Sequence, residues 1–267
     1  MPAPREIHVY PHTGLPDRLQ GTEGTGTPVE DAFVRAARCA SLLYSEALGS
    51  LRSIVPRRSI RLMPGVKEVT ELPVITVDVP GRDFGHVHLT TALLQVPPVE
   101  RSRLALQVIH LAAQQATGRG SRATLQRCYD HAIDNDLVFR WNGSWSASPD
   151  RSRAARPTYR LDPADGWGRV ALEIRDGDGD TPTVTSGEAV AFCTLEGFRR
   201  SAQTMRWSGP DSVEVVPYAG LVGQQAGRLI VRRESGAWSS AVTDDVHVRV
   251  PDLDLTSRPP VIDVVDA

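Results

Sequence analysis

The sequence predicts an α+β fold, with an N-terminal α/β unit followed by a β-rich C-terminal unit that contains one helix. Helical and strand-like patterns are mixed over residues 1–136, whereas strand-like alternation dominates residues 137–267. All five tryptophans lie in the second stretch. A length of 267 residues suits two units of ordinary size, so we place a boundary near residue 136. The pattern leaves open that the two units share one sheet.

The first helix carries the clearest signals of the N-terminal unit. Thr27, Pro28 and Glu30 stand at the N-cap, first and third positions of a capping box, and Gly49 offers a left-handed stop. Apolar residues at helical spacing indicate two further helices. The predicted helices cover residues 28–48, 98–116 and 121–135.

Strands of the N-terminal unit are predicted from alternating apolar and polar residues. The stretch from Leu72 to Val79 alternates cleanly, and Pro80 and Gly81 then suit a turn. Because three such stretches follow one another closely, we expect an antiparallel meander. The predicted strands span residues 5–10, 59–66, 72–79 and 85–91.

Most of the C-terminal unit alternates like half-buried strands, and one helix is predicted over residues 187–203 with Ser186 as its N-cap. The Arg-rich segment 146–157 and the tail 251–267 contain little to bury, so we expect an exposed loop and an extended tail. The predicted strands cover residues 137–145, 157–162, 167–175, 212–218, 227–234 and 245–250.

Composition narrows the class of protein. A net charge of −2 and a pI near 6.4 argue against nucleic acid and anionic membranes as partners. No apolar run reaches the roughly 18 residues of a membrane span, and the N-terminus lacks the apolar run of a signal peptide. Three distant cysteines without a CxxC pair indicate a reducing compartment, so we expect a cytoplasmic protein. Lys67 is the only lysine among 30 basic residues, which is typical of a GC-rich bacterial genome.

Histidines on one strand face form the most suggestive constellation for catalysis. His86 and His88 stand two residues apart, so both side chains project from the same side of the predicted strand, and His8 shares this pattern in the first strand. Such a pair can ligate zinc with an open coordination position, and Asp83 could act as the acid or base. No HExxH motif or spaced acidic ligand accompanies them, so a solvated face is the simpler interpretation.

An acidic run resembles half of a calcium loop. Asp176, Asp178 and Asp180 occupy the first three odd positions, but Thr181 stands where the loop needs glycine and Gly187 stands where it needs glutamate. We therefore expect an acidic turn. The Gly-rich stretch 21–27 matches no phosphate-binding spacing, and its acids argue against nucleotide binding.

Aromatic and basic residues gather at the start of the C-terminal unit, a composition that protein interfaces favour. No GxSxG elbow or other catalytic signature appears in the sequence, and no cofactor is expected unless zinc binds the histidines. The leading hypothesis is a binding or assembly component without catalytic activity that contacts another protein, and the alternative is a metal-assisted hydrolase. The predicted partner-binding residues are Trp141, Trp145, Arg151, Arg153 and Arg156.

Overall fold

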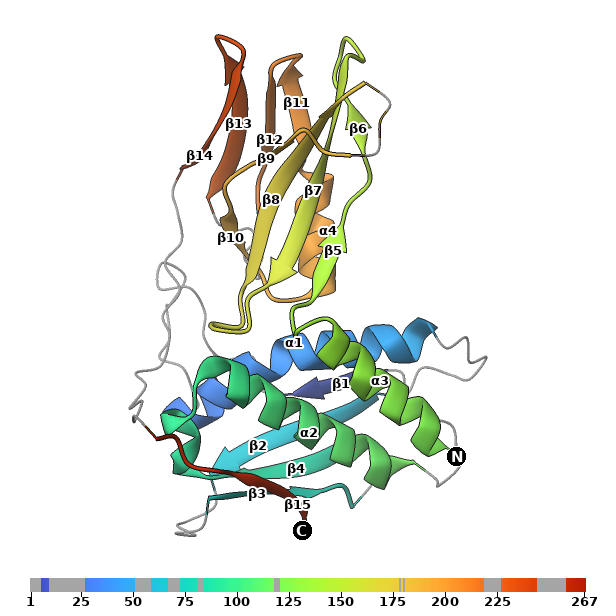
Figure 1. Ribbon diagram of the computed structural model, residues 1–267, viewed down its shortest axis with the longest axis vertical. Coiled ribbons are helices and arrows are strands. Elements are labelled where there is room, and N and C mark those ends of the chain that lie inside the picture. The colour runs from blue at the N-terminus through green and yellow to red at the C-terminus, as the bar shows by residue number, and fades with distance from the viewer. Residues whose placement is uncertain are drawn as a thin grey trace.

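The structure is a computed structural model of the chain. It describes residues 6–9, 27–50, 59–66, 73–80, 84–117, 121–177, 179, 181–218, 227–243 and 258–267. The predicted α+β class is confirmed, with helices on an N-terminal sheet and a single helix among antiparallel C-terminal sheets (Figure 1). None of the helices in the described ranges is long and apolar enough to cross a membrane.

The N-terminal unit is built on a five-stranded mixed sheet with the order β1-β2-β4-β3-β15. β1, β2 and β4 run parallel, β3 is antiparallel to β4, and β15 is parallel to β3. The strands are β1 (Glu6–Val9), β2 (Ser59–Val66), β3 (Val74–Asp78), β4 (Phe84–Leu89) and β15 (Asp263–Asp266).

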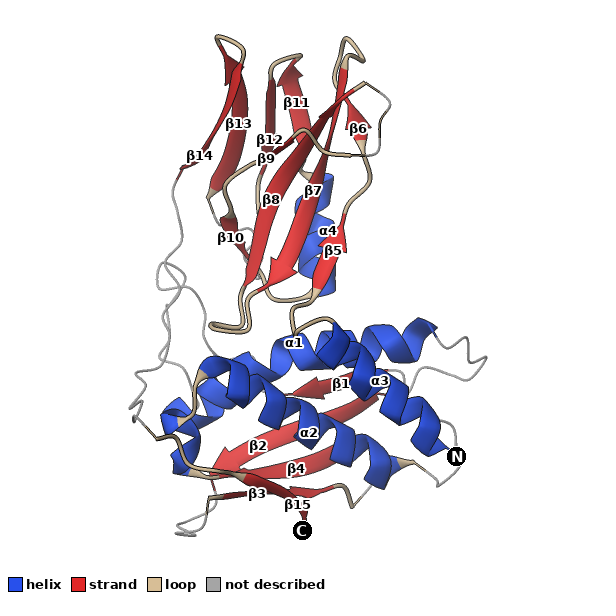
Figure 2. Cartoon of the chain, viewed as in Figure 1, coloured by secondary structure: helices blue, strands red, loops and turns tan. Residues whose placement is uncertain are grey.

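Three helices cover one face of this sheet (Figure 2). They are α1 (Pro28–Ser50), α2 (Pro98–Ala116) and α3 (Arg122–Asp134), and a short 3-10 helix, η2 (Thr91–Gln95), precedes α2. The predicted capping box is present, because the Thr27 amide donates to Glu30 Oε2 at 2.7 Å and the Glu30 amide donates to Thr27 Oγ1 at 3.3 Å. The predicted helix 28–48 is two residues short, since α1 continues through Gly49 and ends at Ser50.

The predicted meander is wrong in its pairing. β2 pairs with β4 in parallel, and β3 lies on the far side of β4, so strands adjacent in sequence are not all adjacent in the sheet. Alternation of side chains is the same in parallel and antiparallel strands, so the pattern predicted the strands without their partners. The central position of β4 buries Val87 and Leu89 against the helices.

The C-terminal unit contains two sheets, and their buried apolar residues belong to a cluster that also includes the core of the N-terminal unit. The first has the order β10-β8-β7-β5, with β6 and β9 attached to its edges, and the second has the order β11-β12-β13-β14. Their strands are β5 (Arg140–Asn142), β6 (Ser146–Ala147), β7 (Arg153–Leu161), β8 (Gly168–Asp176), β9 (Val184–Thr185), β10 (Ala189–Ala191), β11 (Arg206–Gly209), β12 (Ser212–Val215), β13 (Arg228–Glu234) and β14 (Ala237–Thr243).

The helix of this unit, α4 (Leu195–Gln203), begins eight residues later than predicted. Thr194 caps it by accepting a hydrogen bond from the Gly197 amide at 3.1 Å. The expected cap, Ser186, instead accepts from the Leu172 amide at 2.9 Å, so its hydroxyl holds the edge of β8. The intervening residues form β10, which pairs with β8 and buries two alanines.

Two segments expected to lie outside the sheets contain strands. Within 146–157, β6 pairs with the start of β7 and so forms a hairpin rather than an open loop. At the end of the chain, β15 pairs with β3 and Val264 packs on the N-terminal core. The N-terminal sheet therefore takes its last strand from the other end of the sequence, and the boundary near residue 136 stays a prediction. The strand predicted at 245–250 lies outside the described residues.

Helix α1 joins the two units through buried hydrogen bonds. Arg35 Nη1 donates to the Asp165 carbonyl at 3.1 Å, and Arg38 Nη1 donates to the Gly166 carbonyl at 2.9 Å. Cys39 Sγ lies 3.4 Å from the Leu161 carbonyl. Gly166 adopts φ = 69°, and a Cβ there would lie 2.6 Å from the Arg35 carbonyl oxygen. The turn between β7 and β8 therefore touches the backbone of α1.

We expect Gly166→Ala to destabilise the protein by about 3 kcal/mol, because left-handed strain adds to a steric clash with α1. Gly177 is the matched control, since it has φ = 65° and nothing within 4 Å of an added Cβ. Gly177→Ala should cost about 1 kcal/mol from backbone strain alone. Urea unfolding monitored by circular dichroism measures both, and equal losses would contradict the close contact with α1.

Candidate functional site

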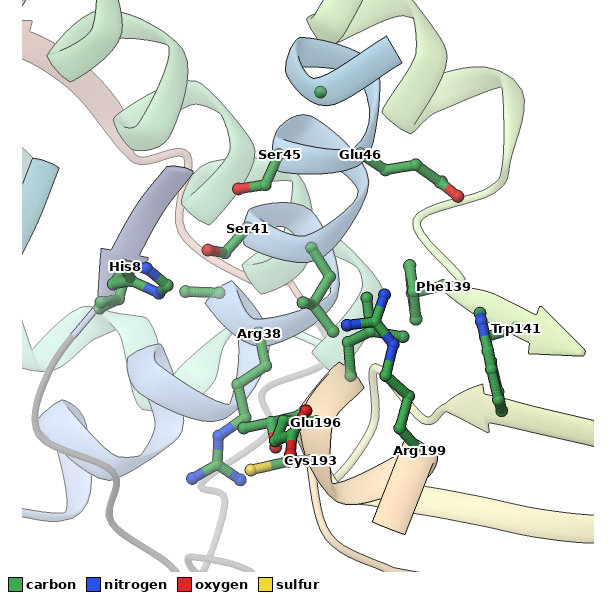
Figure 3. A pocket seen from close by; sticks show the side chains of 16 residues that line it. His8, Arg38, Ser41, Ser45, Glu46, Phe139, Trp141, Cys193, Glu196 and Arg199 are labelled. Carbon is green, nitrogen blue, oxygen red and sulfur yellow. The ribbon is translucent and has the colours of Figure 1, made fainter. Parts of the chain in front are cut away.

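The candidate site is a cleft of about 730 Å³ between the two units, where α1 and β1 face α4 and the segment that leads into β5 (Figure 3). Its volume falls within the range of ligand pockets, roughly 300–1,000 Å³. Apolar and polar side chains both contribute to its walls. The lining residues are His8, Val9, Ala37, Arg38, Ser41, Leu42, Ser45, Glu46, Gly49, Phe139, Trp141, Cys193, Thr194, Leu195, Glu196 and Arg199.

Two serines of α1 hold the edge strand that forms one side of the cleft. The Ser41 hydroxyl donates to the Ile7 carbonyl, and Ser45 Oγ accepts from the Ile7 amide at 3.3 Å. The spacing of four places both hydroxyls on one face of the helix, where they satisfy backbone groups that an edge strand leaves unpaired. Two serines four residues apart on an otherwise apolar helix face can be recognised in the sequence. The predicted site residues nevertheless included neither Ser41 nor Ser45.

Aromatic packing supports the opposite wall. Trp141 is half-buried and its ring centroid lies 5.4 Å from that of Tyr159, which in turn lies 4.7 Å from Phe198 of α4. Phe139 is buried and stacks on Phe198 at 6.4 Å. These contacts fix the side chain of Trp141 at the cleft, so its ring offers a firm apolar surface.

The two acidic residues that line the cleft have partners within the chain, whereas one arginine does not have one among the described residues. Glu46 accepts from His131 Nε2 at 3.2 Å, and Glu196 forms an ion pair with Arg200 at 3.2 Å. Arg199 is exposed and forms no ion pair with any described residue. Its side chain reaches from α4 toward α1 beside Phe139 (Figure 3). The cleft therefore holds a guanidinium group that has no carboxylate partner in the described part of the chain.

Cys193 contributes sulfur to the cleft but little reactivity. Burial raises the pKa of its thiol, so the nucleophilic thiolate is disfavoured. The side chain is only 3% exposed. Cys193 thus acts as a small apolar lining residue.

The predicted histidine site lies elsewhere, on the sheet face opposite the helices. The rings of His86 and His88 stack with centroids 6.4 Å apart and planes 7° apart. His8 lines the cleft instead, and Asp83 lies outside the described residues. The described residues contain no cluster of three His, Cys, Asp or Glu side chains that could hold a metal, and zinc binding stays a prediction.

The acidic run is only partly described. Asp176 accepts a hydrogen bond from Arg153 Nε at 3.1 Å, so this carboxylate has a cationic partner. Asp178 and Asp180 lie outside the described residues. Calcium binding at this turn likewise stays a prediction.

The predicted partner-binding residues are divided between the two ends of the C-terminal unit. Trp141 lies in the cleft, whereas the hairpin that carries the others projects away from the N-terminal unit (Figure 1). There the guanidinium groups of Arg156 and Arg175 lie 4.6 Å and 4.5 Å from the centroid of the Trp145 ring. Arg153 pairs with Asp176 and Asp211, and Arg151 is exposed at the tip.

Comparisons with family models, with curated proteins and with solved structures find no match for this chain.

A buried cation in α2 is a further residue that sequence analysis missed. Arg101 is 3% exposed, and among the described residues neither its Nε nor its Nη2 has a hydrogen-bond partner. Burial lowers the pKa of this guanidinium. The neighbouring Ser102 is buried as well, and its hydroxyl also has no partner in the described ranges. A buried charge without a counter-group is costly, so Arg101 weakens the fold.

Replacing Arg101 by methionine should raise the free energy of unfolding by about 1–3 kcal/mol, because an apolar side chain of similar length fills the site without the desolvation cost. Arg103→Met is the control: Arg103 lies two residues further along α2, is exposed and pairs with Glu100. That change should stay within about 0.5 kcal/mol of the parent protein. Thermal and urea unfolding measure both. A loss of stability in Arg101→Met would show that a counter-group satisfies the buried guanidinium.

Proposed function

We propose that the protein is a binding component and that the cleft between α1 and α4 is its recognition site. The ligand that fits best is an organic anion with a flat apolar body. The observation that carries this proposal is that the exposed guanidinium of Arg199 and the fixed ring of Trp141 line the same cleft of about 730 Å³.

Charge in the cleft supports an anionic ligand. Arg35 and Arg38 donate to backbone carbonyls of the C-terminal unit, and Arg200 pairs with Glu196. Arg199 has no such ion pair with a described residue, so its donors are open to a carboxylate or a similar planar acceptor. Guanidinium binds such groups in a bidentate geometry that fixes their orientation.

The apolar side chains that line the cleft favour a ligand with an apolar body. Leu42 and Leu195 are half-buried and line the cleft together with Trp141 and Phe139. Ligand sites commonly combine such apolar walls with a few polar groups that set orientation. Binding would therefore bury the ring against Trp141 while the acid contacts Arg199.

The proposal keeps the binding role expected from the sequence but replaces the expected protein partner by an organic anion at the cleft. The surface around Trp145 remains a separate candidate for a protein partner. The metal-assisted hydrolase also remains a prediction, and its histidines on β4 lie outside this cleft.

The test uses 2-naphthoate, with 2-naphthylmethanol as the neutral probe of the same shape. We expect calorimetric titration to give tighter binding of the carboxylate, because a charge-assisted hydrogen bond contributes about 1.5–3 kcal/mol. Arg199→Gln should weaken naphthoate binding about tenfold or more and leave the alcohol unchanged.

Arg200→Gln is the matched control, since Arg200 is the adjacent exposed arginine of α4 but is paired with Glu196 and lies over Tyr218. It should bind naphthoate within about twofold of the parent protein, because surface ion pairs contribute little. Equal affinity for acid and alcohol, or equal effects of the two substitutions, would contradict the proposed role of Arg199.

A further inference from the structure

The N-terminal sheet has a second face that the described helices do not cover (Figure 2). Ile60, Leu62 and Val87 point toward the helices and are almost fully buried. Because side chains alternate along a strand, the residues between them point to the opposite side. We call this second surface the open face. His86 and His88 both project from it, and His86 is exposed while His88 is half-buried.

The strand register places further donor atoms around His86. Met63 lies directly beside His86 in the parallel pairing of β2 with β4, and Asp78 lies on its other side in the antiparallel pairing of β3 with β4. Neighbouring strands are about 4.8 Å apart, and two residues along one strand span about 6.6 Å. Long side chains reach cross-strand neighbours at about 7–8 Å. The Met63 thioether and the two imidazoles are therefore close enough to bind one ion.

The chemistry of these donors selects the metal. Thioether sulfur is a soft ligand that favours Cu⁺, whereas hard cations prefer oxygen. Phe84 is 40% exposed and contacts His86 in a T-shaped arrangement with ring centroids 4.7 Å apart, so the surroundings are partly apolar. A singly charged ion loses less hydration free energy in such surroundings than a divalent ion. We infer that the open face binds Cu⁺ through His86, His88 and Met63.

Asp78 has a supporting role in this site. A metal-binding imidazole normally donates its second ring N–H to a carboxylate, a carbonyl or water. The position of Asp78 directly across from His86 suits such an acceptor. Its negative charge also favours a bound cation, so Asp78 is a positioning residue for His86.

The site is completed by the metal. The described residues contain no group of three His, Cys, Asp or Glu side chains that could hold an ion, and this site differs because its third donor is a thioether. The imidazoles of His86 and His88 stand parallel with centroids 6.4 Å apart, so their nitrogens must turn toward a shared ion. Exposed side chains change rotamer within nanoseconds, so this turn requires no movement of the backbone.

Thiols do not compete strongly for the same metal. Cysteine thiolates are soft ligands too, but the three cysteines of the chain are buried. Burial raises the pKa of each thiol, so the thiolate form is disfavoured. The open face therefore offers soft donors that an ion can reach from solvent.

Anaerobic calorimetric titration of the full chain with Cu⁺, kept in solution by dilute acetonitrile, tests the inference. The parent protein should bind one ion per chain. Met63→Leu removes the sulfur but keeps an apolar side chain of similar volume, and it should raise the dissociation constant about tenfold or more. His88→Gln should weaken binding to a similar extent.

Met205→Leu is the matched control, because Met205 is half-buried and packs on the apolar core. It should leave the dissociation constant unchanged. Absence of binding by the parent protein, or equal effects of the two methionine substitutions, would overturn the inference. A loss in His88→Gln without a loss in Met63→Leu would also overturn it, because the sulfur would then not be a ligand.

Methyl groups of methionine labelled with ¹³C give a second measurement that does not depend on affinity differences. The chain contains three methionines. Saturating Ag⁺, which shares the preference of Cu⁺ for sulfur and is stable in air, should shift the NMR signal of the Met63 methyl group. Its absence in Met63→Leu identifies this signal, and the Met205 signal should not move. An unshifted Met63 signal would contradict binding through the thioether.

Discussion

The structure depends on the buried arginines that α1 extends toward the C-terminal unit. Arg35 and Arg38 are 3% and 7% exposed, and burying a guanidinium this deeply is costly unless acceptors meet it. The carbonyls of Asp165 and Gly166 supply those acceptors, and Asp31 pairs with Arg35 Nε at 2.8 Å. These bonds are directional, so they set the position of the β7–β8 turn against the helix. The walls of the cleft follow from that position.

Helix α1 is consequently buried on several sides, each with a different chemistry. Its apolar residues, such as Phe33 and Leu43, pack in the core. Ser41 and Ser45 hold the edge of β1, and the arginines hold the C-terminal unit. Buried polar groups need such partners, which explains why an amphipathic helix carries them at defined positions. The cleft occupies the remaining surface of α1, beyond its contacts with the turn.

Charges are balanced differently in the cleft and in the core. In the cleft, Glu46 contacts His131 and Glu196 pairs with Arg200, while Arg199 has no carboxylate partner among the described residues, which favours an anionic ligand. Arg101 shows the reverse situation within the core, where a charge is buried without compensation and contributes no stability.

The sequence by itself determined the fold class and most helices and strands, because periodic apolar residues act within one element. β2 and α2 match their predicted ranges, and the capping box places the start of α1. Only the tertiary structure decided which strands pair, where β15 belongs and which residues meet in the cleft. Arg35 and its acceptor Asp165 are 130 residues apart in sequence. Such contacts depend on how whole helices and strands pack together, so the spacing of residues within one element cannot predict them.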